Sequence, residues 1–206
     1  MITLYQIKPA FVQLLRPIAA NLVKKRLNAN QVTLSALTGS IVVGTLLIMF
    51  GNTYPVLFLL MPIWMFLRMA LNAIDGIMAK EHNQKSSLGG YLNELSDVIA
   101  DLFLFLPFAF IAPFSIYSIG TVIILSIISE LCGVLAHSIK VERRYDGPLG
   151  KSDRALIFGA LALWVGLSFP LSHLASYLPW LVSLLILINC YNRIKNALQV
   201  EKTQEH

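Results

Sequence analysis

NAIDGIMAKEHNQKSSLGGYLNELSDVIAD, residues 72–101, is the stretch that decides how this chain is interpreted. It places carboxylates and carboxamides inside two segments that are otherwise apolar enough to cross a membrane. Ionisable side chains are costly at membrane depth, so those found there mark functional sites. The stretch therefore predicts a polar site between two membrane helices.

The composition of the whole chain indicates an integral membrane protein. Of its 206 residues, 56% are hydrophobic and 13% are charged, and the mean hydropathy is +0.69. Soluble domains carry about 25% charged residues, and a membrane helix needs roughly 20 mainly apolar residues. Six apolar segments approach that length, near residues 31–50, 54–80, 88–112, 116–139, 154–170 and 175–198. We predict an all-α, polytopic fold of six transmembrane helices that follow an interfacial amphipathic helix at 1–28.

The distribution of basic residues predicts the orientation of this bundle. We expect one membrane domain, residues 1–206, with the six helices between 31 and 198. The connections near 51–54, 112–117 and 170–176 contain no Lys or Arg, whereas the other loops and both ends do. The positive-inside rule then places both termini in the cytoplasm. We expect a bacterial inner-membrane protein with no nucleic-acid partner. The first thirty residues mix apolar and basic residues and lack a compact apolar stretch before a small-residue cleavage site, so we expect no cleavable signal peptide.

Polar and small residues recur at helical spacing on both sides of the 81–87 loop. In the second segment they are Arg68, Asn72, Asp75, Gly76 and Ala79. In the third they are Gly89, Asn93, Asp97 and Asp101. Side chains three or four positions apart share one face of a helix. The two faces are expected to turn toward each other and away from lipid.

The aspartates on these faces indicate a metal site. Carboxylate and carboxamide oxygens are preferred ligands of Mg²⁺, Mn²⁺ and Ca²⁺. Ionised aspartates that lie close together repel, and a divalent cation relieves the repulsion. Such a cation also binds phosphate oxygens in phosphoryl transfer. A cation or proton transporter uses similar carboxylates, but these cluster toward one side with no polar path to the other face.

The spacing of these residues resembles the motif of the CDP-alcohol phosphotransferases. The family motif is D-x2-D-G-x2-A-R-x8-G-x3-D-x3-D, and residues 72–97 read N-x2-D-G-x2-A-K-x8-G-x3-N-x3-D. Every spacing is kept, and the identical residues are Asp75, Gly76, Ala79, Gly89 and Asp97. The departures are Asn72, Lys80 and Asn93.

The resemblance implies a fold and a reaction. The family is a six-helix bundle with an amphipathic N-terminal helix and an active site near the cytoplasmic face. Its members use divalent metals, Mg²⁺ or Mn²⁺, to transfer a phosphatidyl or similar group from a CDP-alcohol to an acceptor hydroxyl, with release of CMP. The implied substrates here are CDP-diacylglycerol and a small alcohol, in phospholipid biosynthesis at the membrane lipid surface. A homodimer is also a family expectation.

The resemblance further implies roles for individual residues. The metal ligands would be Asn72, Asp75, Asn93, Asp97 and Asp101, and Asp97 would also be the base that deprotonates the acceptor. The residues expected to bind the nucleotide or its phosphates are Asn30, Thr33, Gly76, Ala79, Lys80, Gly89, Lys151 and Arg154. Within this set, Asn30 and Thr33 also suit an ordinary helix start, and Lys151 and Arg154 also suit a positive-inside anchor.

The departures from the motif leave several hypotheses open. Asn72 and Asn93 offer carbonyl oxygens without charge, so Asp101 is expected to replace part of the missing charge. A slide of one helical turn, which would give Asp97 and Asp101 the roles of the last two motif aspartates, is an alternative. Binding of one metal instead of two is another, and a degenerate member that binds nucleotide or lipid without turnover is a third. Glu130 is expected to form an ion pair inside the bundle.

Overall fold

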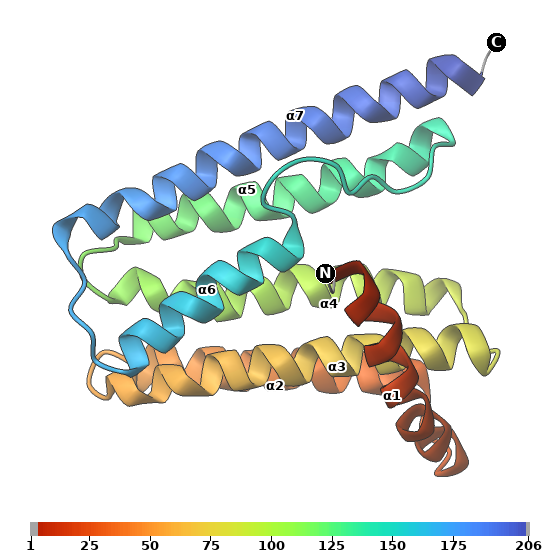
Figure 1. The fold of residues 1–206 in the computed structure, drawn as a ribbon, viewed down its shortest axis with the longest axis horizontal. Helices are drawn as coiled ribbons and strands as arrows, with labels where there is room; N and C mark the ends of the chain where they lie inside the picture. The colour runs from red at the N-terminus through yellow and green to blue at the C-terminus, as the bar shows by residue number, and fades with distance from the viewer. Residues whose placement is uncertain (1–3, 205–206) are drawn as a thin grey trace.

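The structure, a computed structural model, describes residues 4–204, with side chains from Phe11 onward (Figure 1). The described residues are all-α and form seven helices: α1 (Leu4–Lys24), α2 (Ala29–Phe50), α3 (Leu60–Glu81), α4 (Ser87–Phe105), α5 (Ile116–Leu135), α6 (Lys151–Gly166) and α7 (Leu178–Gln204). Short 3₁₀ segments flank several of them: η1 (Pro55–Leu59), η2 (Leu106–Phe110), η3 (Ala136–Ile139) and η4 (His173–Tyr177).

Each predicted apolar segment corresponds to a helix, and four helices are long and apolar enough to cross a membrane. These four are Ala29–Phe50, Pro55–Glu81, Ile116–Ile139 and His173–Gln204. The all-α polytopic membrane fold is thus confirmed. The two remaining helices differ for physical reasons: α4 carries three carboxylates, and α6 has only 16 residues. The count of six spans stays a prediction, as does the interfacial position of 1–28, of which residues 1–3 lie outside the described part.

The helices form two groups, which meet where α4 and η2 contact α5. Helices α2, α3 and α4 pack side by side, α5 packs along α7, and α6 lies between the groups (Figure 1). Helix α1 crosses α3, where Leu15 and Ala19 are buried in a cluster with Ile74 and Ile77. This contact fixes α1 against the same part of α3 that carries the polar motif.

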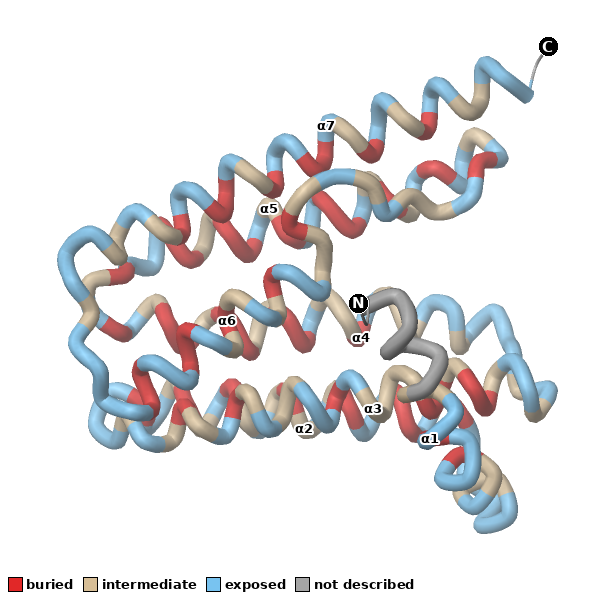
Figure 2. Tube along the Cα trace, viewed as in Figure 1, coloured by how far each residue is buried: buried red, intermediate tan, exposed pale blue. Residues whose placement is uncertain are grey.

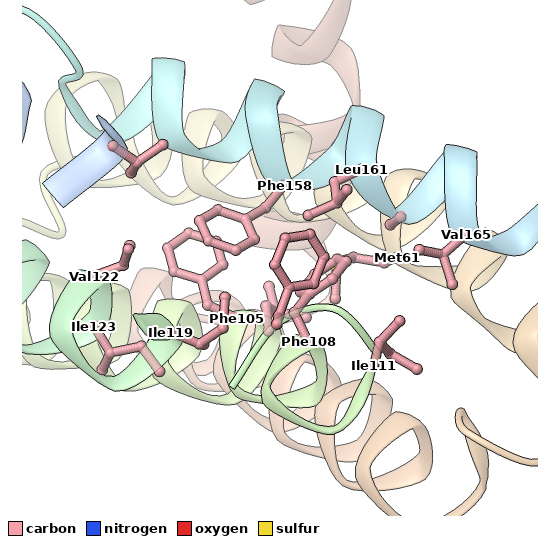
Figure 3. Packing of buried hydrophobic residues seen from close by; sticks show 14 of the residues in the cluster. Met61, Phe105, Phe108, Ile111, Ile119, Val122, Ile123, Phe158, Leu161 and Val165 are labelled. Atoms are coloured by element: carbon pink, nitrogen blue, oxygen red, sulfur yellow. The ribbon is translucent and has the colours of Figure 1, made fainter. Parts of the chain in front are cut away.

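Aromatic packing holds α6 against the other helices. The rings of Phe105 and Phe158 stack with centroids 4.0 Å apart, and Phe108 lies 5.3 Å from Phe158 (Figure 3). Phe58 from η1 contacts Phe108 at 5.1 Å. Aromatic pairs of this kind contribute roughly 0.5–1.5 kcal/mol beyond the area that they bury. The cluster therefore fixes the middle of α6 relative to the end of α4, which matters because both helices contribute charged residues to the site.

The outer surface of the bundle suits a lipid environment. Buried residues face between helices and exposed residues face outward (Figure 2). Many outward side chains are large and apolar, among them Phe66, Ile124, Leu163 and Leu187. In water such a surface would favour aggregation, whereas in hydrocarbon it has no cost.

Candidate functional site

The polar faces of α3 and α4 meet, as the sequence predicts. Asn72 on α3 donates a hydrogen bond from Nδ2 to Oδ1 of Asp97 on α4, at 3.1 Å. One turn away on α3, Asp75 is buried and accepts a hydrogen bond of 2.6 Å from the hydroxyl of Thr33 on α2. Residues from three helices thus converge at the end of the bundle where α3 ends and α2, α4 and α6 begin.

The start of α2 is held in place by side chains that the motif does not contain. Asn28 and Gln31 form a capping box, which satisfies free amides of the first turn. The amide of Ala29 donates to Oε1 of Gln84 in the α3–α4 loop, at 2.7 Å. Gln84 looks like an ordinary loop residue in the sequence, yet this bond ties the loop to the helix that carries Thr33.

Asn30 lies close to Gly89, and Thr33 lies against Asp75. A Cβ built on Gly89 would lie 2.9 Å from Oδ1 of Asn30, so a larger residue there would require the Asn30 side chain to move. Gly76 has no atom within 4 Å of the equivalent position, which leaves open space beside Asp75. Ala79 is half-buried and Lys80 is exposed at the end of α3. The part of the site nearest the loop is therefore accessible.

Asp97 is surrounded by positive and neutral donors. Its Oδ1 accepts from Asn72 and from Nη2 of Arg68, each at 3.1 Å. Its Oδ2 pairs with the ammonium group of Lys151, the first residue of α6. Both carboxylate oxygens are engaged, so the structure holds Asp97 as a fixed anion.

Asp101 lies one turn deeper and belongs to an ion-pair network. Its Oδ1 pairs with Nη1 of Arg68 at 2.7 Å, and its Oδ2 lies 3.9 Å from Nη2 of Arg154. Arg68 thereby links Asp97 to Asp101, and Arg154 links Asp101 to the next helix. The predicted role of Asp101 as a metal ligand has no support in this arrangement, since both oxygens face guanidinium groups.

Glu130 on α5 is the centre of that network. It pairs with Arg154 at 2.7 Å, with Arg143 at 2.8 Å and with Arg193 at 3.6 Å. Arg143 also pairs with Glu94 on α4. The expected ion pair of Glu130 inside the bundle exists, with these three arginines as partners. Arg68 pairs instead with the aspartates of α4.

The segment between α5 and α6 is folded back onto α7. Asn189 donates to the carbonyl oxygens of Asp146 and Pro148, at 3.0 and 2.9 Å. Burial acts to raise the pKa of Asp146, but hydrogen bonds from Arg144 and Asn196 and the charge of Arg144 hold that pKa below its ordinary value. The segment is thus fixed at its centre, and it delivers Lys151 and Arg154 to the site.

The donor set fits one divalent cation better than two. Asp75 has no ion-pair partner among the described residues, and its Oδ2 accepts a hydrogen bond from Thr33. Asn72 donates to Asp97, and Asn93 is half-buried on α4. Within residues 11–204, however, no group of three or more His, Cys, Asp and Glu side chains is arranged to hold a metal. A second ion at Asp97 would have to displace Lys151.

Comparisons with known proteins agree with the motif. The sequence profile of the CDP-alcohol phosphatidyltransferases matches residues 26–189. The chain is 46% identical over 197 residues to the inner membrane protein YnbA of Escherichia coli (strain K12), which covers 95% of this chain and 96% of that protein. Its fold is similar to the crystal structure of Mycobacterium tuberculosis phosphatidylinositol phosphate synthase (PgsA1) with CDP-DAG bound, with a TM-score of 0.71 and 21% identity over 90% of this chain and 94% of that one.

Proposed function

Since this chain belongs to the CDP-alcohol phosphatidyltransferase family, we propose that it transfers a phosphatidyl group from a CDP-alcohol to a small alcohol and releases CMP. CDP-diacylglycerol is the proposed donor, because the similar fold of PgsA1 was solved with CDP-DAG bound. The proposed reaction forms a bond between the acceptor oxygen and the β-phosphorus and breaks the bond from that phosphorus to CMP. The acceptor proton leaves to a base on the protein.

The observation that carries this proposal is the convergence of Thr33, Asp75 and Asp97. Three separate helices bring a hydroxyl and two carboxylates together beside the open space at Gly76. An isolated motif match would not require this arrangement.

The proposed cofactor is one divalent cation, Mg²⁺ or Mn²⁺, held by Asp75 with the carboxamide oxygens of Asn72 and Asn93. Bound there, it would neutralise charge on the phosphates as the CMP group leaves. Thr33 fixes the rotamer of Asp75 through its 2.6 Å hydrogen bond. Lys80 and Lys151 supply further positive charge near the phosphates, each as a point charge without the bidentate geometry of arginine.

Asp97 is the proposed base. Arg68 and Asn72 hold its Oδ1, which leaves Oδ2 as the oxygen that accepts the proton. Lys151 occupies Oδ2 in this structure, and its side chain is about a third exposed, so an acceptor hydroxyl can take its place. The acceptor hydroxyl then lies within hydrogen-bonding reach of the base, as general-base catalysis requires.

The membrane arrangement proposed with this function has six crossings. Helices α4 and α6 would cross the membrane together with the four apolar helices. The charged side chains of α4 and α6 would face the ion-pair network inside the bundle. Both termini and the site would face the cytoplasm by the positive-inside rule. An inner-membrane location follows the name of the similar protein YnbA, and a homodimer remains part of the proposal.

A non-catalytic binder is the second candidate, and the environment of Asp97 favours it. A carboxylate paired with Arg68 and Lys151 is a weaker base than one without cations. If no acceptor displaces Lys151, the site would hold a CDP-alcohol without turnover.

Ligand-dependent stability tests whether the site binds nucleotide and metal. The midpoint of thermal unfolding is expected to rise when CDP or CMP is added together with Mg²⁺ or Mn²⁺, because ligands that bind the native state stabilise it. Asp75→Asn is expected to remove the metal-dependent part of the rise. An equal rise in both proteins would contradict the assignment of Asp75, and no nucleotide effect at all would favour ion transport. Measurement of CMP release from CDP-diacylglycerol then distinguishes a transferase from a non-catalytic binder.

A further inference from the structure

Asp97 has two cationic partners, and they differ in how firmly they are held. Arg68 is buried, contacts Oδ1 of Asp97 with Nη2 at 3.1 Å and is shared with Asp101. Lys151 pairs with Oδ2 from the start of α6, and its side chain is 31% exposed. The arginine is therefore a permanent part of the bundle, whereas the flexible lysine can leave the carboxylate and return to it.

The start of α6 brings Lys151 to the site without help from its ion pair. The amide of Gly150 donates to Oδ2 of Asp153 at 3.0 Å, which caps the helix. Nη1 of Arg154 donates to the carbonyl oxygen of Leu149 at 3.1 Å, and both residues are buried. Because the backbone on each side of Lys151 is fixed, its ammonium group stays near the site even when the ion pair opens.

The positive charge of Lys151 acts on more than one carboxylate. Besides its ion pair with Asp97, the ammonium group attracts the carboxylates of Asp75 on α3 and Glu94 on α4. A divalent cation bound between α3 and α4 would act on carboxylates of the same helices. The ammonium group therefore already supplies part of the charge that such an ion would bring.

The carboxamides near Asp97 add no negative charge that would hold a further ion there. Asn72 presents an N–H group to Oδ1 of Asp97, at 3.1 Å. Asn93, one turn before Asp97 on α4, offers an oxygen without charge. A divalent cation beside the ammonium group of Lys151 would be repelled by it. The ion and the ammonium group therefore compete for Oδ2 of Asp97.

We propose that the ammonium group of Lys151 takes the place of a second divalent cation at Asp97, so that the site holds one ion only, at Asp75. A group tethered to the chain competes with free ions at an effective concentration of about millimolar. Removal of the ammonium group should therefore open Oδ2 of Asp97 to a metal ion. This inference rests on the proposed function for the ion at Asp75, whereas the competition at Asp97 rests on the ion pair with Lys151.

The number of bound Mn²⁺ ions tests the inference without any need for turnover. Electron paramagnetic resonance measures the ions bound per chain on purified protein in detergent, without nucleotide. The unmodified protein is expected to bind one Mn²⁺. Lys151→Gln removes the charge at nearly the same side-chain length and is expected to bind one more ion at the same Mn²⁺ concentration. Lys151→Arg keeps the charge and is expected to bind no more than the unmodified protein.

Two further variants locate the additional ion. Lys202→Gln removes a lysine charge from an exposed position near the end of α7 and is expected to leave the number of ions unchanged. Asp97→Asn combined with Lys151→Gln is expected to lose the additional ion, because that ion needs the carboxylate that the lysine has left. Lys151→Ala gives the same comparisons if Lys151→Gln does not fold.

Three results would overturn the inference. Two Mn²⁺ ions on the unmodified protein would show that the ammonium group excludes none. Equal numbers for Lys151→Gln and Lys202→Gln would show that the lysine occupies no cation site. An additional ion that persists in the double variant would lie away from Asp97.

The same measurements keep the inference separate from the proposed function. Absence of CMP release, with the ion numbers as predicted, would count against the proposed function alone. Absence of Mn²⁺ from the unmodified protein would count against the proposed ion at Asp75. The gain of Lys151→Gln over the unmodified protein would still decide whether Lys151 occupies a cation site.

Discussion

The carboxamide of Asn72 donates a hydrogen bond to Oδ1 of Asp97 across the interface of α3 and α4, at 3.1 Å. In the family motif an aspartate stands at position 72, and it would place a second negative charge against Asp97. The asparagine instead stabilises Asp97 as an anion without a metal ion between them. This substitution therefore changes how the site balances its charge.

Asn72→Asp is expected to make the protein depend more strongly on divalent cations. Two carboxylates at this distance repel, so the variant should unfold at a lower temperature than the unmodified protein in a chelator. Addition of Mn²⁺ should stabilise the variant more than the unmodified protein, because the added charge strengthens the ligand set. Thermal unfolding with and without Mn²⁺ measures both effects.

Asn52→Asp is the control for that variant, because Asn52 is exposed in a loop at the far end of α2. This control variant should change neither the unfolding temperature in a chelator nor the stabilisation by Mn²⁺. Equal Mn²⁺ stabilisation of Asn72→Asp and the unmodified protein would contradict the placement of a metal beside Asn72.

Thr33→Val is expected to destabilise the protein and to weaken metal binding. Valine has nearly the shape of threonine but leaves buried Asp75 without its 2.6 Å hydrogen bond. A hydrogen bond to a charged group contributes about 1.5–3 kcal/mol. Chemical unfolding should show a loss of that order, and Thr38→Val at an exposed position of α2 should show little loss. A Thr33→Val protein as stable as the control would mean that the hydroxyl does not support Asp75.

The sequence predicts the fold and the motif site well because both depend on local patterns. Helix positions follow from apolar length, and the meeting of Asn72 with Asp97 follows from four-residue spacing on two helices joined by a short loop. Asn30 and Thr33 also lie beside the motif residues, through Gly89 and Asp75 respectively. The residue spacing of the family motif therefore predicts contacts between side chains on separate helices.

The ion-pair network could not be predicted in the same way. Arg143 looks like a positive-inside anchor in the sequence, yet it bridges Glu94 on α4 and Glu130 on α5. Arg154 looks like a similar anchor and is fully buried. These pairs depend on how α6 packs between the two helix groups, which no local pattern encodes. The available signal was Glu130 itself, since a carboxylate in an apolar helix needs a counter-charge.

Asp75→Ala is expected to reduce Mn²⁺ affinity more than Asn72→Ala. Asp75 supplies a full negative charge and pairs with no cation among the described residues, whereas Asn72 supplies one neutral oxygen. Calorimetric titration with Mn²⁺ compares the two variants with the unmodified protein. The reverse order of affinities would contradict the assignment of Asp75 as the main ligand.

Asp101→Asn separates a structural role from metal binding at that position. Arg68 would lose one of its two carboxylate partners and Arg154 its weaker one, so the free energy of unfolding should fall by about 3 kcal/mol or more, as for other broken buried pairs. Mn²⁺ affinity should stay the same, because both oxygens of Asp101 face arginines. Loss of Mn²⁺ binding in a folded Asp101→Asn protein would restore Asp101 to the metal site.

CMP release from CDP-diacylglycerol by the purified protein tests the central claim most directly. With Mg²⁺ or Mn²⁺ and a small alcohol acceptor, we predict CMP formation together with a new phosphatidyl-alcohol lipid. Both products should disappear when the metal is chelated and when Asp97 is replaced in Asp97→Asn. A protein that binds CDP and metal but releases no CMP with any alcohol acceptor, charged or uncharged, would contradict the transferase function and identify a binder.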